Sequence, residues 1–296
     1  WTDGTPRPER YSKFNYLHPK VAGEALQESH GDDWFSFARS AYHRSQPYLS
    51  AIWGGDVQGG IEGLLSNMEN GLRCSYMGFP VFGSDGGSYW ANPDDNVHQR
   101  WLQFCLWSGF FQWKLDGRLP WGRSKTVQDV FRRTCEDRMQ LLPYVYSIAN
   151  TSDRLGAMMR PMSYMYPDDS QTWGMSEQYM FGPAFLVAAP VVNAAIDSRT
   201  VYLPQGTWVN YYDYSQKFSG KQTVTLPCPA DKAPVLVKKN SIFVTGTIFA
   251  GNMVKWISDF SGSRTVTVHA FPGSTGASTE FLYVDYLDSD KEKTIS

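Results

Sequence analysis

Apolar residues in the first half of the chain follow two spacings in turn, which predict helices and strands. Between residues 60 and 73 and between 95 and 111 they recur every three or four positions, as on one face of a helix. Short apolar runs bounded by glycine or polar residues separate these segments and are typical of strands. The alternation indicates a parallel sheet with crossover helices.

The individual elements follow from the same pattern. We predict a loop over residues 1–18, a helix from Pro19 to Gly31, strands over 34–38, 49–53 and 79–82, helices over 60–73 and 95–111, and a helix over 125–150 kinked at Pro143. Asp94 or Asp95 is the expected cap of the helix over 95–111. The run at 34–38 is rich in aromatic residues and predicts a buried strand.

After about residue 158 the pattern changes to short apolar segments bounded by turns. Such segments are typical of antiparallel strands in a β-sandwich. We predict strands over 185–192, 200–203, 208–212, 223–226, 235–237 and 242–244, and a further set over 253–257, 265–270 and 280–285. The chain is therefore expected to be α/β followed by all-β.

Three aspartates are candidates for chemistry. Asp56 ends the run WGGD and Asp85 lies in SDGG, each after a predicted strand, while Asp3 lies in WTDG. Two carboxylates on neighbouring loops of a (β/α) barrel are the usual equipment for cleaving a glycosidic bond. Trp53 and the glycines beside Asp56 predict partly apolar surroundings, which would suit a proton donor. The alternative is that these aspartates are ordinary turn residues.

Composition narrows the class of partner. Aromatic residues make up 15% of the chain, with 11 Trp, 17 Tyr and 17 Phe. Sugars stack on aromatic rings, although large proteins also use such rings to fill a core. The net charge of −2 gives no electrostatic reason to expect nucleic acid or an anionic membrane as partner.

Other chemistries find little support. The five histidines and four widely spaced cysteines form no metal-binding pattern, and no nucleotide-binding glycine motif occurs, so we predict no metal and no cofactor. We see no apolar run long enough to span a bilayer. The stretch 285–293 lacks the glycine and final glutamate of a calcium loop and predicts a solvated turn. A glycosylation sequon at Asn150 favours a secreted or luminal location.

Longer runs of sequence resemble a known family. The runs ARSAYHRSQPYLSAIWGGD, FPVFGSDGG and HQRWLQF occur in this order, and LLPYVYS, MMRPMSYMYPDD, FLVAAPV and YLPQGTWVNYY follow. This ordered set is similar to glycoside hydrolase family 31, which contains α-glucosidases and α-xylosidases. The resemblance covers nearly the whole chain.

The resemblance implies roles for the candidate residues. Asp56 falls on the family's acid/base, in its tryptophan–x–glycine–aspartate motif, and Asp3 falls on the nucleophile. Arg39 and Trp53 fall on positions that line the −1 sugar subsite, and Asp85 falls on an aspartate that supports the sugar site. Trp1, Lys114 and Asp116 complete the predicted substrate-binding residues.

Lys114 and Asp116 depart from the family pattern. They stand where the resemblance leads us to expect an arginine and a histidine that binds sugar hydroxyls. An ionised aspartate accepts hydrogen bonds but donates none. We therefore expect reversed hydrogen bonding or a different sugar at this position.

The resemblance also implies a domain organisation. Residues 1–158 would form the C-terminal half of a (β/α)8 barrel, 159–245 a proximal β-sandwich domain and 246–296 the start of a distal β domain. Half of the barrel is then missing, which would leave strand edges and the apolar interior open. We expect an N-terminal fragment or a partner chain to complete it, and the 296-residue chain alone to aggregate or to lack activity.

The function that these observations favour is a retaining α-glycosidase acting on α-glucosides or related α-linked oligosaccharides. Asp3 would attack the anomeric carbon, and Asp56 would protonate the leaving group and then activate water. Close alternatives are an α-xylosidase, an α-galactosidase or a transglycosylase. A catalytically degenerate carbohydrate-binding chain is the alternative from another class.

Overall fold

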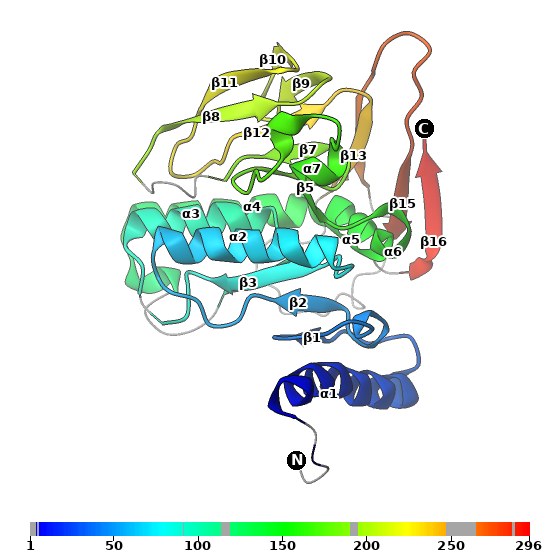
Figure 1. Cartoon of the computed structure of the whole chain (residues 1–296). Helices are drawn as coiled ribbons and strands as arrows, with labels where there is room; N and C mark the ends of the chain where they lie inside the picture. The colour runs from blue at the N-terminus through cyan, green and yellow to red at the C-terminus, as the bar shows by residue number, and fades with distance from the viewer. Residues whose placement is uncertain are drawn as a thin grey trace.

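The computed structural model describes residue 4 and residues 6–90, 92–113, 119–189, 195–246, 265–285 and 288–296. A parallel sheet with helices comes first in the chain and antiparallel sheets follow, as Figure 1 shows. The predicted fold class, α/β followed by all-β, is confirmed. The predicted strand over 253–257 lies outside the described residues.

The parallel sheet has four strands in chain order. They are β1 (Phe37–Ala38), β2 (Ala51–Trp53), β3 (Phe82–Gly86) and β4 (Phe110–Trp113). The helices of this part are α1 (Arg7–His30), α2 (Ile61–Tyr76), α3 (Asp95–Leu106), α4 (Lys125–Gln140), α5 (Leu142–Asn150) and the short α6 (Ser152–Leu155). Because all pairs are parallel, the carboxyl ends of the strands lie along one edge, where a barrel carries its active site.

Helix α1 corrects the loop predicted over residues 1–18. The helix begins at Arg7 and runs through Pro19 to end before Gly31, whose φ is +62°. Pro8 fits the first turn because the N–H groups there have no partner within a helix. Reading Pro6, Pro8 and Gly4 as loop signals missed this, whereas the end at Gly31 is confirmed.

Two helix ends also differ from the prediction. Asp94, one of the two expected residues, caps helix α3. The helix was predicted to reach residue 111 but ends at Leu106, since Phe110 belongs to β4. The helix predicted over 125–150 is two helices, α4 and α5, which meet at Leu141. Pro143 lies in the first turn of α5, so it begins a new helix and does not kink a continuous one.

The strands carry two further corrections. The strand predicted over 34–38 is reduced to the two residues of β1 and is not buried, since Phe37 is 45% exposed and Phe35, before the strand, is 60% exposed. β3 starts at Phe82 and contains Asp85, which the sequence placed in the loop after the strand. Asp85 is therefore held by the sheet itself and is buried.

The antiparallel part is built around a six-stranded sheet in the order β10-β9-β12-β7-β6-β5. Its strands are β5 (Met159–Pro161), β6 (Tyr179–Phe181), β7 (Phe185–Val187), β9 (Thr207–Asn210), β10 (Asp213–Ser219) and β12 (Val235–Lys238). The two-stranded sheets are β8 (Ser198–Leu203) with β11 (Gln222–Pro227), β13 (Ser241–Thr245) with β14 (Thr267–Phe271), and β15 (Phe281–Asp285) with β16 (Asp288–Ile295). The short helix α7 (Met162–Met165) follows β5.

A buried cluster explains how two of these sheets pack. Val201 and Leu203 of β8 meet Leu186, Trp208 and Leu236 from the six-stranded sheet, so two layers enclose one core. The solvated turn predicted over 285–293 is wrong, because β16 pairs with β15 there. The polar strand β10 carried no apolar pattern and was missed.

The parallel and antiparallel parts share a second, larger core. Trp107, just after α3, is fully buried and its ring contacts those of Phe181 and Phe185. The Tyr179 hydroxyl donates to the Trp107 carbonyl at 2.8 Å. β13 and β14 pair with each other although the predicted boundary between the proximal and distal β domains, at residue 245, lies between them. The limits of the three predicted domains stay a prediction.

Candidate active site

The loop Trp53-Gly54-Gly55-Asp56 lies at the carboxyl end of β2. A side chain on either of its glycines would collide with neighbouring side chains. Gly55 has φ +75°, and a Cβ there would lie 3.1 Å from Arg39 Nε. A Cβ on Gly54 would lie 1.8 Å from Asn67 Oδ1. The loop therefore passes so close to the side chains of Asn67 and Arg39 that glycine is favoured at both positions.

The structure brings together Arg39, Trp53 and Asp56, three of the predicted site residues. Arg39 Nη2 lies 3.1 Å from Asp56 Oδ2, and the Asp56 side chain is 14% exposed. The Arg39 guanidinium lies 5.6 Å from the centre of the Trp53 ring. The partly apolar surroundings expected for Asp56 stay a prediction, to which the structure adds a cation beside its carboxylate.

Asp85 lies at the end of the next strand and accepts a hydrogen bond from Gln112 of β4. The two residues are direct partners in the parallel register. The glycine after Asp85 is needed because a Cβ on Gly86 would lie 2.0 Å from the Trp113 ring. β2, β3 and β4 thus present Asp56, Asp85 and Gln112 along one edge of the sheet.

Sequence reasoning missed Gln112 and Asn67. Gln112 gave no signal because its pairing with Asp85 depends on the strand register. Asn67 of α2 is fully buried against Gly54, and neither its amide nitrogen nor its oxygen has a hydrogen-bond partner among the described residues. A polar residue on the apolar face of a predicted helix was the available signal for Asn67.

The neighbouring residues Arg100 and Trp101 of α3 contact different parts of the chain. Trp101 lies beneath β3, and its Nε1 donates to Ser84 Oγ at 3.4 Å. The buried Arg100 points toward the antiparallel part, where it donates to the carbonyls of Pro229, at 2.8 Å, and Ile196. Arg100 therefore links the parallel and antiparallel parts of the chain.

The other four predicted site residues, Trp1, Asp3, Lys114 and Asp116, lie outside the described residues. Their roles stay a prediction, as does the separation of Asp3 and Asp56.

Other reactive groups in the described part of the chain are buried or dispersed. Burial raises the pKa of the Cys74 and Cys105 thiols to about 11 and about 12, so neither is a thiolate at neutral pH. Within the same residues no group of three or more His, Cys, Asp or Glu side chains is placed to hold a metal ion. None of the described helices is long and apolar enough to cross a membrane.

Comparison with known proteins gives two family matches. The model of the glycosyl hydrolases family 31 TIM-barrel domain matches residues 5–148. The model of the glycosyl hydrolase family 31 C-terminal domain matches residues 156–243. Both parts of the fold are therefore recognised, in the order in which they occur along the chain.

Individual relatives agree with these matches. An α-xylosidase of Emericella nidulans is 29% identical over 81% of this chain and 32% of its own length. Neutral α-glucosidase AB of Mus musculus is 31% identical over 77% of this chain and 25% of its own. A family 31 dextranase of Flavobacterium johnsoniae, solved with glucose, superposes with a TM-score of 0.84 at 25% identity over 95% of this chain and 36% of that one.

The chain thus spans between 25% and 36% of the length of these relatives. The order of the two matched domains is the one that the sequence motifs implied. The chain belongs to glycosyl hydrolase family 31, whose members are glycosidases.

Proposed function

We propose that this chain carries the proton donor and part of the sugar site of a retaining α-glycosidase that acts on α-glucosides or related α-linked oligosaccharides. The observation that carries the proposal is the meeting of Asp56, Arg39 and Trp53 at the edge of the parallel sheet where Asp85 also lies. Carboxylates at the ends of parallel barrel strands are the usual equipment of such enzymes.

The proposed reaction has two displacements. Asp3 attacks the anomeric carbon and forms a covalent glycosyl ester, while Asp56 gives its proton to the departing oxygen. Asp56 then takes a proton from the water that attacks the ester. The two carboxyl groups must lie about 5–5.5 Å apart for this sequence of steps.

The surrounding residues support these roles. Arg39 bonds to Asp56 and packs on Trp53, so it fixes the direction of the carboxyl group. The buried Asp85 accepts a hydrogen bond from Gln112 at the neighbouring strand end, and we assign it a supporting role in the sugar site. Lys114 and Asp116 are proposed to contact the same sugar from the chain that follows β4.

The test compares leaving groups on the complete enzyme, meaning the protein in which the barrel is closed. Asp56→Ala should lower kcat/KM for a disaccharide by about 10²–10⁴-fold, the usual contribution of a proton donor. The loss should be smaller for a p-nitrophenyl α-glycoside, because p-nitrophenolate leaves without a proton. Asp3→Asn should lower the rate on both substrates.

An aspartate outside the proposed site serves as the control. Asp153 is exposed on α6, and Asp153→Asn should retain the wild-type rates. Wild-type rates in both Asp3→Asn and Asp56→Ala would refute the assigned roles. A panel of p-nitrophenyl α-glucoside, α-xyloside and α-galactoside identifies the sugar.

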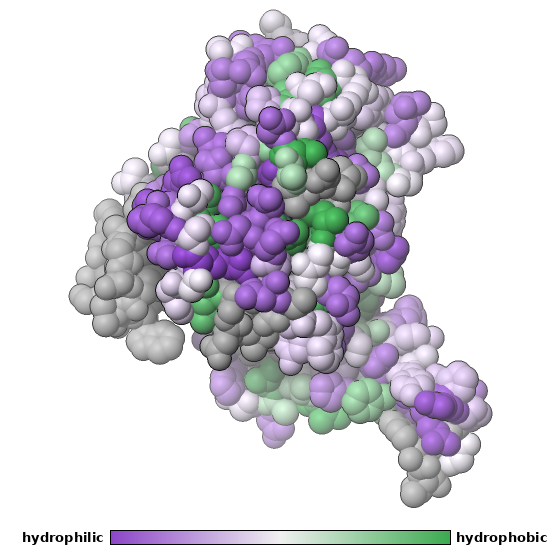
Figure 2. Space-filling view, turned by 90° about the vertical axis from the view of Figure 1, so that its left-hand side faces the viewer, coloured by the Kyte–Doolittle hydropathy of each residue, from purple (hydrophilic) through white to green (hydrophobic). Residues whose placement is uncertain are grey.

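We further propose that strands supplied from outside these 296 residues complete the barrel. Four parallel strands are described, and within the described residues β1 and β4 are each paired on one side. The rings of Phe35 and Phe37, just before and at the start of β1, lie 6.1 Å apart and are 60% and 45% exposed. Figure 2 shows hydrophobic surface low on the face that it presents, and such surface is typical of a contact region.

A further inference from the structure

Asp85 and Gln112 form a hydrogen-bonded pair across two neighbouring strands. Gln112 Nε2 donates to Asp85 Oδ1, and the two residues are direct partners in the parallel register of β3 and β4. Asp85 is 1% exposed, so its carboxylate is almost completely shielded from water. Hydrogen bonds to ionised acceptors are stronger than those between neutral groups, so the amide of Gln112 has a firm hold on the direction of this carboxylate.

Ring contacts show which face of the sheet Gln112 occupies. The centre of the Trp113 ring lies 4.7 Å from that of His98 in α3, so Trp113 faces the helices. Because successive side chains of a strand point to opposite faces, Gln112 and Phe110 face the other way. The Phe110 ring lies 5.4 Å from the Phe37 ring of β1, although a flat sheet would place β1 and β4 roughly 14 Å apart. The sheet therefore curves toward this face, which is the one that a closed barrel encloses.

Asp85 lies on the same inner face. Its neighbour Ser84 accepts a hydrogen bond from Trp101 of α3 at 3.4 Å, so Ser84 faces the helices and Asp85 faces away from them. Gly83 has no side chain, and a Cβ there would lie 2.6 Å from the Phe110 ring. The carboxylate and the amide therefore lie side by side on the inner face, one step nearer than the Phe110 ring to the carboxyl ends of the strands.

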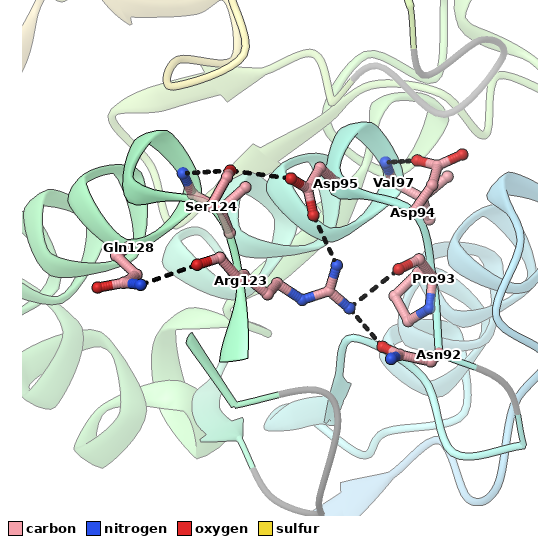
Figure 3. A network of polar contacts seen from close by, with 9 residues as sticks. Asn92, Pro93, Asp94, Asp95, Val97, Arg123, Ser124 and Gln128 are labelled. Atoms are coloured by element: carbon pink, nitrogen blue, oxygen red, sulfur yellow. Dashed lines mark hydrogen bonds and ion pairs between the residues drawn. The ribbon is translucent and has the colours of Figure 1, made fainter. Parts of the chain in front are cut away.

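A separate set of hydrogen bonds joins the segments that follow the two strands. The Arg123 guanidinium, shortly before α4, donates to the Pro93 carbonyl at 2.9 Å and to Asn92 Oδ1, and its Nη1 lies 2.9 Å from Oδ1 of Asp95, the first residue of α3. Figure 3 shows this guanidinium between the starts of the two helices. β3 and β4 are thus joined by more than the amide of Gln112, so its loss should free the neighbouring carboxylate without separating the strands.

We propose that Gln112 is the positioning residue of Asp85, and that its amide holds the carboxylate in the direction that the sugar site requires. The inference rests on the proposed function, because it takes this edge of the sheet, with Asp56, as the sugar site. It adds a residue that no sequence motif identified. Without the amide, the carboxylate can turn about its side-chain bonds, so a smaller fraction of the enzyme is ready to bind the sugar.

The test is a double-mutant cycle on the complete enzyme, with kcat/KM for the p-nitrophenyl α-glycoside of the preferred sugar as its readout. Gln112→Met keeps the length of the side chain but removes the donor, and should lower kcat/KM about tenfold, the order of one hydrogen bond to a charged group. In an Asp85→Ala background the same change should have less than about a twofold effect, because no carboxylate remains to be positioned. Asp85→Asn replaces Asp85→Ala in the cycle if the alanine variant does not fold.

A second substitution separates positioning from packing. Gln112→Lys has a similar length to Gln112→Met but carries a donor, so it should recover most of the lost kcat/KM. Gln178→Met is the matched control, since Gln178 is also buried and its Nε2 donates to the Tyr202 carbonyl at 2.8 Å in the antiparallel part. It should leave kcat/KM within about twofold of wild type, and urea unfolding of every variant measures stability separately.

The outcomes distinguish this proposal from the one on which it rests. If Gln112→Met lowers kcat/KM by the same factor with and without the Asp85 carboxylate, or if Gln112→Lys recovers nothing, the positioning role is wrong while the glycosidase remains. If the wild-type enzyme cleaves no α-glycoside, the proposed function fails and the positioning role fails with it.

Discussion

At the scale of single residues, the Asp56 loop is specified by what lies against its backbone. Asn67 Oδ1 occupies the place of a side chain on Gly54, and Arg39 occupies that on Gly55. Within the part of the chain that the structure describes, the buried Asn67 amide has no hydrogen-bond partner, and such a group destabilises the folded state. This destabilisation is consistent with a role of Asn67 in fixing the position of the Asp56 loop.

The contact between Gly54 and Asn67 gives the first prediction. Gly54→Ala should destabilise the protein by about 1–3 kcal/mol through overpacking and should lower activity by moving Asp56. Combining it with Asn67→Ala should restore part of both losses, because the clashing amide is then absent. Urea unfolding and kcat/KM of the two single variants and the double variant form the cycle. Strictly additive effects would show that Asn67 does not constrain the loop.

Asp95 gives a prediction for pH dependence. Burial alone would raise the pKa of Asp95, but the hydrogen bonds from Arg123 and Ser124 outweigh this and hold the pKa below its usual value. The carboxylate therefore contributes stability above its unfolded pKa of about 3.9, and this stability disappears as pH falls through the lower folded value.

The difference in unfolding free energy between wild type and Asp95→Asn should therefore be present at pH 7 and shrink below about pH 4. Urea unfolding between pH 2.5 and 7 measures it. Asp94→Asn is the matched control, because Asp94 caps the same helix without touching Arg123. A difference that stays constant down to the lowest pH would contradict the assigned ion pair.

At the scale of elements, periodicity was a good guide wherever an element has one buried face. Helix α2 and strand β2 lie where the pattern placed them, because their apolar residues face the shared core. The pattern failed for α1, which buries only Pro19 and Gly23 and so has little apolar periodicity. It failed also for β10, whose residues are mostly exposed.

The candidate site was predictable to the extent that it lies in short motifs. Asp56 and Arg39 were both named from sequence and do meet. Gln112 and Arg123 were not, because each acts on a segment more than 25 residues away through strand register or a loop contact. Local pattern contains no information on such pairings, which depend on how strands and helix starts are placed in space.

Arg138 of α4 shows how one residue joins two elements. Its guanidinium donates to the carbonyls of Leu106, Ser108 and Gly109 at 2.7–2.9 Å, where α3 ends and the chain enters β4. Burial lowers its pKa to about 10, so it remains charged at neutral pH. The start of β4, and with it Gln112, therefore depends on this residue.

Arg138→Met should destabilise the complete enzyme strongly, by roughly 1–3 kcal/mol for each buried carbonyl left without a donor. Urea unfolding measures the loss. Arg133→Met on the same helix is the control, because the Arg133 side chain is exposed and its ion pair with Asp231 at 3.5 Å should contribute at most about 1 kcal/mol. Equal losses in the two variants would mean that the carbonyl contacts of Arg138 carry no special weight.

At the scale of the whole molecule, the parallel sheet and the antiparallel sheets depend on each other. Trp107 and Tyr179 pack across the junction, and Arg100 and Gln103 bind the carbonyl groups of residues 229–230. The antiparallel part thus supports α3, and α3 supports the strand that holds Asp85. By contrast, the β1 end of the parallel sheet carries exposed aromatic residues.

The exposed rings of Phe35 and Phe37 allow a test of where the barrel is completed. Phe35→Ser and Phe37→Ser should each change the stability of the isolated 296-residue chain by no more than about 1 kcal/mol, since the two residues are 60% and 45% exposed there, and should reduce its tendency to aggregate. In the complete enzyme the same changes should cost about 3–5 kcal/mol if added strands bury the rings. Light scattering of the chain and urea unfolding of the enzyme measure the two effects. Trp173→Ser, at an exposed position in the antiparallel part, should leave the stability of both proteins unchanged. A Phe35 or Phe37 variant that also leaves both stabilities unchanged would show that the barrel is not completed at these residues.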